Sequence, residues 1–420
     1  MKLPRLVPIR VRRECPELAD LEHSVLVELD RIGVEKLVQA GKRIAVAAGS
    51  RGIHRADVIL RTVVGRLAAC GAKPFIVPAM GSHGGATAEG QRALLAGYGI
   101  TEATMGCPVV SSMETVCLGR IPGGVTGYCD RNAAEADGIV VVNRVKPHTN
   151  FSGTIGSGLL KMLGIGLGKH TGAQNVHQRG VEIGYEESIR EGGLLALSKL
   201  RILFGVAVVE NPLGRTAHLE AVLPADFEAA DERLILRARR LMGRLPGDFL
   251  HLLIVDWMGK NISGTGMDPN VTGRGVVQEK VKLNAPRILR IFIRDLTEET
   301  HGNAIGIGFA DFTTDRLVAK IDAKATWTNV LTSMAPHEAR VPIHFPTDRE
   351  AIEAALSTCG ATPAEFMRVV RIRDTEHIDP MLVSESLFEE LSGRDDVEAL
   401  GPAAEMSFDA GGNLTPPAED

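Results

Sequence analysis

The stretch that decides the fold is Gly138–His170, GIVVVNRVKPHTNFSGTIGSGLLKMLGIGLGKH. Its first residues, Gly138–Asn143, form an apolar run that is typical of a buried strand. Lys146, His148, a glycine-rich polar loop and Lys161 then follow. Imidazoles and amines can move protons, hold a metal ion or bond a cofactor, and glycines let the backbone approach a ligand closely. We therefore expect the chemistry of the protein to lie after this strand.

The chain before this stretch repeats the order strand, loop, helix. The sequence predicts strands at 43–49 and 74–80, and helices at 56–70 and 87–98. This order is typical of a parallel α/β sheet, in which ligands bind at the carboxyl ends of the strands.

Three loops are predicted to meet at that sheet edge. They begin at Ser50, Gly81 and Lys146, each after a predicted strand. His83 follows Gly81 in a glycine-rich turn that could hold an anion through backbone N–H groups. The turn lacks the Gly-x-Gly-x-x-Gly spacing of a dinucleotide site, so the sequence does not support NAD. Ser50 and Arg51 either hold a phosphate or begin the next helix.

The rest of the chain continues the α/β pattern. The remaining predicted strands are 201–209, 252–256, 288–294 and 368–373, and the remaining predicted helices are 186–199, 224–244, 323–334 and 348–357. Because 420 residues exceed a typical single domain, we expect an α/β fold of two α/β domains, 1–265 and 266–420. The sheets should be of parallel type, with the active-site crevice between the domains. The segment from about Gly411 is rich in Gly, Pro and acidic residues and is expected to fray.

Composition narrows the class of protein. Aromatic residues make up 4% of the chain, the net charge is −5, and no Lys/Arg run could follow a phosphate backbone, so a nucleic-acid binder is not expected. The six cysteines contain no Cys-x-x-Cys pair, which is typical of a reducing compartment without a disulfide framework. The sequence shows neither an apolar signal core nor a stretch of membrane-spanning length. We expect a cytoplasmic protein that acts on a small molecule.

Individual residues have competing interpretations. His148 is predicted to be functional rather than a capping residue, because Pro147 restricts the loop that carries it. Lys161 lies among leucines, so its amine either reaches solvent or points into the crevice, where desolvation would make it nucleophilic. The polar loop Gly259–Arg274 is either a domain hinge or a substrate cap carrying Lys260, Asn270 and Arg274.

The same residues resemble the nickel-dependent lactate racemase family (LarA-type proteins) over nearly the whole chain. His148, Phe151–Gly153, Lys161 and His177 match the family's histidine, Ser-Gly-Gly-x-Lys-like loop and later histidine. The Gly81-Ser-His-Gly turn stands where the family has Gly-Thr-His-Arg.

The resemblance implies a nickel pincer nucleotide, pyridinium-3,5-bisthiocarboxylic acid mononucleotide nickel. It implies that His177 is the protein ligand of the nickel and that Lys161 can bond the cofactor through a thioamide. It also implies that His148 is one of two histidines that exchange the hydroxyl proton of a 2-hydroxy acid. The predicted function is thus a racemase or epimerase that removes hydride from C2 of the substrate and returns it. Cofactor-synthesis enzymes are the predicted partners, because they would supply the nickel pincer nucleotide. The remaining predicted site residues are His83 as the second proton-transfer group, Ser50, Arg51, Ser152 and Gly153 for the cofactor, and Lys260, Asn270 and Arg274 for the substrate.

Two positions depart from the family. Pro108–Glu114, where the family has its second catalytic histidine, contains none, and Gly84 replaces an arginine. His83, Ser111, Ser112 or Glu114 could stand in for the missing histidine. These changes favour a hydroxy acid other than lactate. Two alternatives stay open: a zinc hydrolase built on His83, His148 and His177, and a non-catalytic homologue that binds a nucleotide or another anion.

Overall fold

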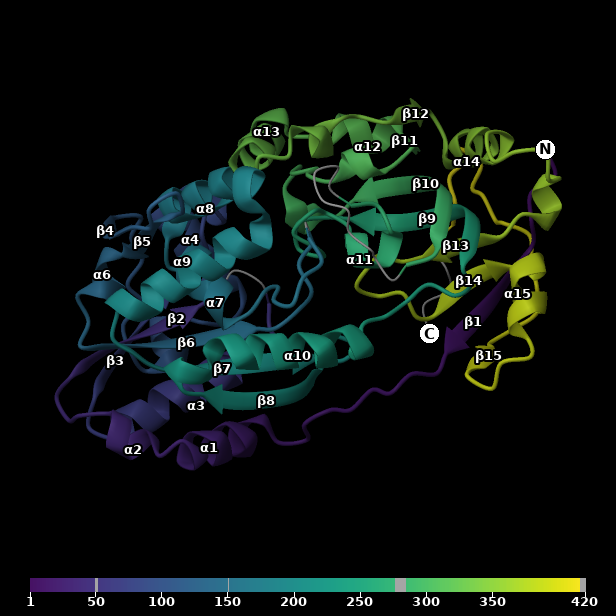
Figure 1. Cartoon of the computed structure of the whole chain (residues 1–420). Helices are drawn as coiled ribbons and strands as arrows, with labels where there is room; N and C mark the ends of the chain where they lie inside the picture. Colours follow the sequence, from purple (N-terminus) through teal and green to yellow (C-terminus); the bar gives the residue numbers. More distant parts are fainter. Residues whose placement is uncertain (50–51, 150, 276–284, 416–420) are drawn as a thin grey trace. The chain divides into compact units, whose positions relative to one another are not determined.

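The structure is a computed structural model that describes residues 1–49, 52–149, 151–275 and 285–415. It has two compact units (Figure 1). The N-terminal unit consists of residues 15–242 and 332–334, and the C-terminal unit of residues 1–14, 243–331 and 335–420. Both are of the α/β class.

The N-terminal unit is built on a five-stranded sheet. Its strands follow the order β3 (Lys73–Pro78), β2 (Arg43–Ala48), β6 (Gly138–Arg144), β7 (Ile202–Glu210) and β8 (Thr216–Val222). The first four are parallel, and β8 pairs with β7 in the antiparallel direction at the edge. A separate hairpin consists of β4 (Thr115–Arg120) and β5 (Thr126–Asp130).

Helices cover both faces of this sheet. The α-helices are α1 (Leu21–Arg31), α2 (Val34–Leu37), α3 (Ala56–Ala69), α4 (Ala88–Gly97), α5 (Glu102–Met105), α6 (Arg131–Ala134), α7 (Leu159–Lys161), α8 (Lys169–Ile183), α9 (Tyr185–Lys199) and α10 (Phe227–Leu241). Short 3-10 turns are η1 (Gly84–Ala86) and η3 (Pro224–Asp226), and η2 (Met162–Gly166) is a π-helical turn.

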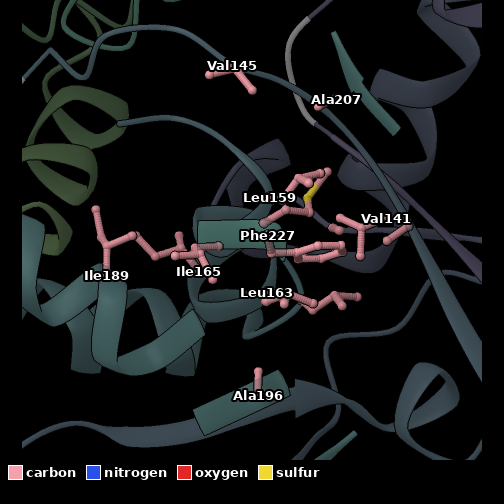
Figure 2. Close-up of a cluster of buried hydrophobic side chains, with 14 of the residues drawn as sticks. Val141, Val145, Leu159, Leu163, Ile165, Ile189, Ala196, Ala207 and Phe227 are labelled. Carbon is pink, nitrogen blue, oxygen red and sulfur yellow. The ribbon is translucent and has the colours of Figure 1, made fainter. Parts of the chain in front are cut away.

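Two apolar clusters hold the layers together. Successive side chains of a strand point to opposite faces, so Ile139 and Val141 of β6 join one cluster whereas Val140 and Val142 join the other. The second cluster contains α1 and α3. The first contains α7, η2, α9 and α10, and Figure 2 shows part of it, with Phe227 of α10 near Leu159. The strand that precedes the predicted site is thus buried on both faces.

The C-terminal unit is built on an eight-stranded mixed sheet. Its strands follow the order β12 (Ile343–Phe345), β11 (Phe312–Thr314), β10 (Arg287–Leu296), β9 (Phe249–Met258), β13 (Val369–Ile372), β14 (Met381–Ser384), β1 (Leu6–Val11) and β15 (Val397–Ala399). The strands from β12 to β13 are parallel, and the other pairings are antiparallel. The helices are α11 (Pro269–Thr272), α12 (Asp315–Ala319), α13 (Ala323–Thr332), α14 (Asp348–Ser357) and α15 (Glu385–Leu391), with 3-10 turns η4 (Glu298–Thr300), η5 (Ile307–Phe309), η6 (Pro336–Ala339) and η7 (Ala364–Phe366).

The chain ends differ from the sequence-based expectations. The first strand, β1, pairs inside the C-terminal unit, and that unit resumes at Gly243, whereas the sequence divides the domains between residues 265 and 266. Local pattern cannot reveal this exchange, because β1 finds its partners more than 370 residues away. The expected fraying from Gly411 is wrong up to Thr415: Leu414 is buried, and its N–H donates to Asp348 at 2.8 Å.

None of the six cysteines, all of which are described, forms a disulfide. Across the described parts of the chain, no helix combines the length and the apolar character that a membrane crossing requires.

Candidate functional site

The carboxyl ends of three neighbouring strands form one edge of the N-terminal sheet. β2 lies between β3 and β6 and is parallel to both. The loops that begin at Gly81 and Lys146 therefore leave the sheet at the same edge, as predicted. Ser50 and Arg51, predicted to bind the cofactor at this edge, lie outside the described residues, so their role stays a prediction.

A two-residue bridge joins the segments of His148 and Lys161. The N–H of Lys146 donates to the Ser157 carbonyl at 3.0 Å, and the N–H of Ser157 donates back at 2.9 Å. The Ser157 hydroxyl accepts a hydrogen bond from Lys161 Nζ at 3.1 Å. A Cβ at Gly156 would lie 3.1 Å from the backbone nitrogen of His148, so glycine permits this close approach of the two backbones. The structure thus brings these two predicted site segments together.

The His148 ring is buried and stacked. It is 8% exposed, and its centroid lies 4.4 Å from that of Phe151, with 19° between the planes. Phe151 belongs to the first of the two apolar clusters of this unit. Stacking on a core residue fixes the plane of the imidazole, which a directional proton transfer needs.

Lys161 lies where the helix geometry changes. It ends α7, the π-helical turn η2 follows, and α8 continues the run. Its four neighbours in sequence are buried, whereas Lys161 itself is half-buried. Its amine binds the hydroxyl of Ser157 on the preceding turn. Single π-turns inside helices occur frequently at functional sites.

The start of this helical run is capped from another helix. Asp231 of α10 is 1% exposed and accepts hydrogen bonds from the N–H groups of Leu159 (2.9 Å) and Leu160 (3.0 Å). Burial raises the pKa of Asp231 to about 6, although the two N–H groups favour its charged form. A Cβ at Gly158 would lie 2.3 Å from Asp231 Oδ1, so this approach also requires glycine. Asp231 therefore helps to set the position of Lys161.

A second carboxylate fixes the glycine-rich loop. Glu186 accepts from the N–H groups of Thr154 (2.7 Å) and Ile155 (3.2 Å). A Cβ at Gly153 would lie 1.9 Å from Glu186 Oε2, which explains the glycine without a ligand. Ser152 is exposed. The cofactor contacts of Ser152 and Gly153 stay predictions.

The turn that carries His83 is packed against η2. The N–H of Gly81 donates to the Gly166 carbonyl at 3.1 Å. Gln91 Nε2 donates to the carbonyls of Gly81 (2.9 Å) and His83 (3.2 Å). Gly84 has φ +65°, and a Cβ there would lie 2.6 Å from the Gln91 nitrogen. His83 is half-buried.

The other candidates for the missing histidine have local partners. The Ser111 hydroxyl donates to the first carbonyl of α4 at 2.7 Å, and the Ser112 hydroxyl accepts from the Glu114 N–H at 3.0 Å. The Glu114 side chain is exposed and pairs with Arg131 at 2.9 Å. The role of His83 as the second proton-transfer group stays a prediction.

His177 lies on α8, which follows α7 and the π-helical turn η2 in the chain. Its Nδ1 is 3.1 Å from the carbonyl oxygen of Thr332, and its ring meets that of Tyr185 edge-on at 6.3 Å. A carbonyl only accepts, so Nδ1 carries the proton, and in the neutral ring Nε2 bears the lone pair. Metal-binding histidines commonly have this arrangement.

The predicted substrate residues lie in the C-terminal unit. Lys260 follows β9, and its amine hydrogen-bonds Asn329 of α13. Asn270 lies in the first turn of α11, and its side chain binds Asp268 at 2.9 Å. Burial raises the pKa of nearby Glu338 to about 7, against the attraction of Lys260.

Arg274 is held by the fold of the C-terminal unit. Its guanidinium pairs with Asp311 at 2.7 Å and donates to the Leu289 carbonyl at 3.0 Å. These bonds anchor Arg274 to β10 and to the residue before β11. Substrate binding by Lys260, Asn270 and Arg274 stays a prediction.

Sequence reasoning missed the three polar residues that position the site. Asp231 and Gln91 fall on the apolar stripes of their helices, with Leu234 and Leu95 one turn further on. A polar residue on such a stripe is a detectable signal of a buried hydrogen bond. Glu186, in the first turn of α9, has no such signal, because acidic residues are common there.

Comparisons with known proteins bear on the sequence of the N-terminal part and on the fold. Residues 6–186 match the family model of the lactate racemase N-terminal domain. No curated protein matches the chain. Among solved structures, the lactate racemase apoprotein from Thermoanaerobacterium thermosaccharolyticum is 14% identical, with a TM-score of 0.50, over 94% of this chain and 96% of that chain. At this identity the structural likeness shows the fold alone, and the match to the family model is limited to residues 6–186. Residues 6–186 of the chain are thus similar in sequence to a lactate racemase N-terminal domain, and the fold of the chain is similar to that of a lactate racemase.

Proposed function

We propose that the protein is a racemase or epimerase of a 2-hydroxy acid that uses a nickel pincer nucleotide. The observation that carries the proposal is the bridge between Lys146 and Ser157, which joins the His148 and Lys161 segments inside a lactate racemase N-terminal domain. A base and an amine on one rigid element are what the reaction and its cofactor need.

The residues present fit such a cofactor. His177 would hold the nickel, because the carbonyl on Nδ1 selects the tautomer with the lone pair on Nε2. Imidazole is a suitable ligand for nickel. Lys161 would anchor the organic part through its amine.

The chemistry follows from the substrate. When bound, the cofactor would accept hydride from C2 and return it, which avoids an enolate next to a carboxylate. His148 would take the proton of the C2 hydroxyl and give it back, because an imidazole with a pKa near neutrality serves both directions. The 2-oxo acid that results is flat at C2, so either face can be reduced.

His83 would serve as the second proton-transfer group, and Lys260, Asn270 and Arg274 would bind the substrate. Gly84 and the histidine-free segment Pro108–Glu114 favour a hydroxy acid other than lactate.

A zinc hydrolase is less well supported. In the described ranges 1–49, 52–149, 151–275 and 285–415, no three His, Cys, Asp or Glu side chains are grouped as a metal site requires. A non-catalytic homologue would bind a nucleotide or another anion without turnover.

Solvent deuterium tests the reaction type. The protein, co-expressed with cofactor-synthesis enzymes, is incubated in D2O with single enantiomers of a panel of 2-hydroxy acids. We expect one acid to racemise with its original hydrogen kept at C2, because a hydride does not exchange with water. Chiral chromatography with mass spectrometry measures both quantities. Deuterium at C2 of the inverted product would contradict hydride transfer, and an inert but cofactor-loaded protein would support the non-catalytic homologue.

A further inference from the structure

Lys169 is a fully buried lysine that joins three elements of the N-terminal unit. Its exposure is 0%, and its Nζ donates to the Pro78 carbonyl at the end of β3 at 2.6 Å. It also donates to Gln91 Oε1 of α4 at 3.0 Å and pairs with Asp130 at the end of β5 at 3.2 Å. Burial lowers the pKa of Lys169, and Asp130 opposes that effect. None of these contacts reaches solvent.

The Gln91 side chain connects Lys169 to the turn that carries His83. An ammonium group only donates, so Lys169 fixes Oε1 of the amide toward itself and Nε2 away from itself. Nε2 then donates to the carbonyls of Gly81 and His83, which only accept. Each partner is satisfied in one orientation of the amide only. Gln91 is 0% exposed, so water cannot replace these bonds.

The backbone of Lys169 is unusual as well. Its φ is +55°, in the left-handed region that non-glycine residues rarely adopt. The residue begins α8, directly after the segment that starts at Lys161. The Asp130 N–H donates to the Leu167 carbonyl at 2.7 Å, which ties the same segment to β5. Strained backbone of this kind persists where surrounding contacts determine it, and it is frequent at functional sites.

We propose that Lys169 and Gln91 are positioning residues that hold the Gly81–Ala86 turn, and with it His83, against the segment of Lys161. Asp130 supplies the counter-charge that lets the lysine be buried. The role assigned to His83 rests on the proposed function, but the contacts that hold the turn do not.

Hydrogen–deuterium exchange tests the proposal without turnover. In Gln91→Leu and in Lys169→Met, we expect the amides of residues 81–87 to exchange about tenfold faster or more, because the turn loses its buried donors. The two effects should not add in the double variant, since both substitutions break the same chain of hydrogen bonds, from Lys169 through Gln91 to the turn. The side-chain NMR signals of His83 should shift in both variants.

A matched control separates positioning from loss of stability. Asn211 is another buried amide of the N-terminal unit, and it binds the carbonyl of Pro16 (3.0 Å) and the N–H groups of Leu213 and Arg215. Asn211→Leu should lower the melting temperature without accelerating exchange at 81–87. Unchanged exchange at 81–87 in both Gln91→Leu and Lys169→Met would overturn the proposal.

A second variant and a kinetic measurement complete the test. If Lys169→Met does not fold, the near-isosteric Gln91→Glu, whose carboxylate would face two carbonyl oxygens, should still accelerate exchange at 81–87. If the enzyme is active, Gln91→Leu should lower kcat more than it raises KM. Inactivity of the wild type would contradict the proposed function only. Hydrogen–deuterium exchange at residues 81–87 would still decide whether Lys169 and Gln91 hold the turn.

Discussion

The His148→Asn variant should retain its fold and its cofactor and lose about a thousandfold in kcat, because a positioned general base contributes roughly 10²–10⁴-fold. His148 is 8% exposed and stacked on Phe151, so its imidazole is held in one plane beside the Lys146–Ser157 bridge. Asparagine fills much of the same space and can form hydrogen bonds, but it cannot take up a proton near neutral pH. The measurements are the rate of racemisation and the nickel content of the same preparation.

The matched control is His218→Asn. His218 is a partly buried histidine of the same unit, on the edge strand β8, where it pairs with Glu220 at 3.1 Å. It belongs to no part of the candidate site, so we expect the racemisation rate to change less than about threefold. Similar losses in both variants would mean that His148 acts through stability rather than through proton transfer.

Replacing Asp231 with alanine should lower the free energy of unfolding by about 3 kcal/mol, because it leaves two buried N–H groups without an acceptor. These N–H groups belong to Leu159 and Leu160, directly before Lys161. We therefore expect less cofactor on the protein as well. Denaturant unfolding monitored by circular dichroism measures the first effect, and nickel content measures the second.

The pH dependence of this effect has a definite sign. Burial raises the pKa of Asp231 from 3.8 to about 6, so the native state holds this proton more tightly than the unfolded state. The stability that follows from this difference is present below about pH 4 and is lost as the pH rises through about 6. The stability difference between wild type and Asp231→Ala should therefore shrink between pH 4 and pH 7. A difference that grows over this range would contradict the assignment.

Much of the fold follows from local pattern. The predicted helix 348–357 coincides with α14, and the predicted strand 201–209 lies within one residue of β7 at each end. Both have a strong apolar period and clear caps or turns. β8 was not predicted, because its alternation is interrupted and because its place at the edge of the sheet, beside β7, is defined only by tertiary structure.

The sequence predicts the loops of the candidate site, but it does not predict the residues that hold these loops in place. His148 and Lys161 follow a strongly apolar strand, so topology alone places them at a sheet edge. Asp231 and Gln91 act on those loops from helices distant in sequence, and no local rule links them to their partners. Nor does local pattern reveal that Thr332 meets His177, 155 positions earlier in the chain.

The most direct test of the account is the nickel content and intact mass of the protein co-expressed with the cofactor-synthesis enzymes, compared with those of His177→Ala. We expect about one nickel per wild-type chain and a mass increase equal to that of the pincer nucleotide. His177→Ala should keep its fold and lose most of the nickel. Wild-type protein without nickel or added mass, or His177→Ala with a normal nickel content, would contradict the assignment of this chain as a nickel-pincer enzyme with His177 as its ligand.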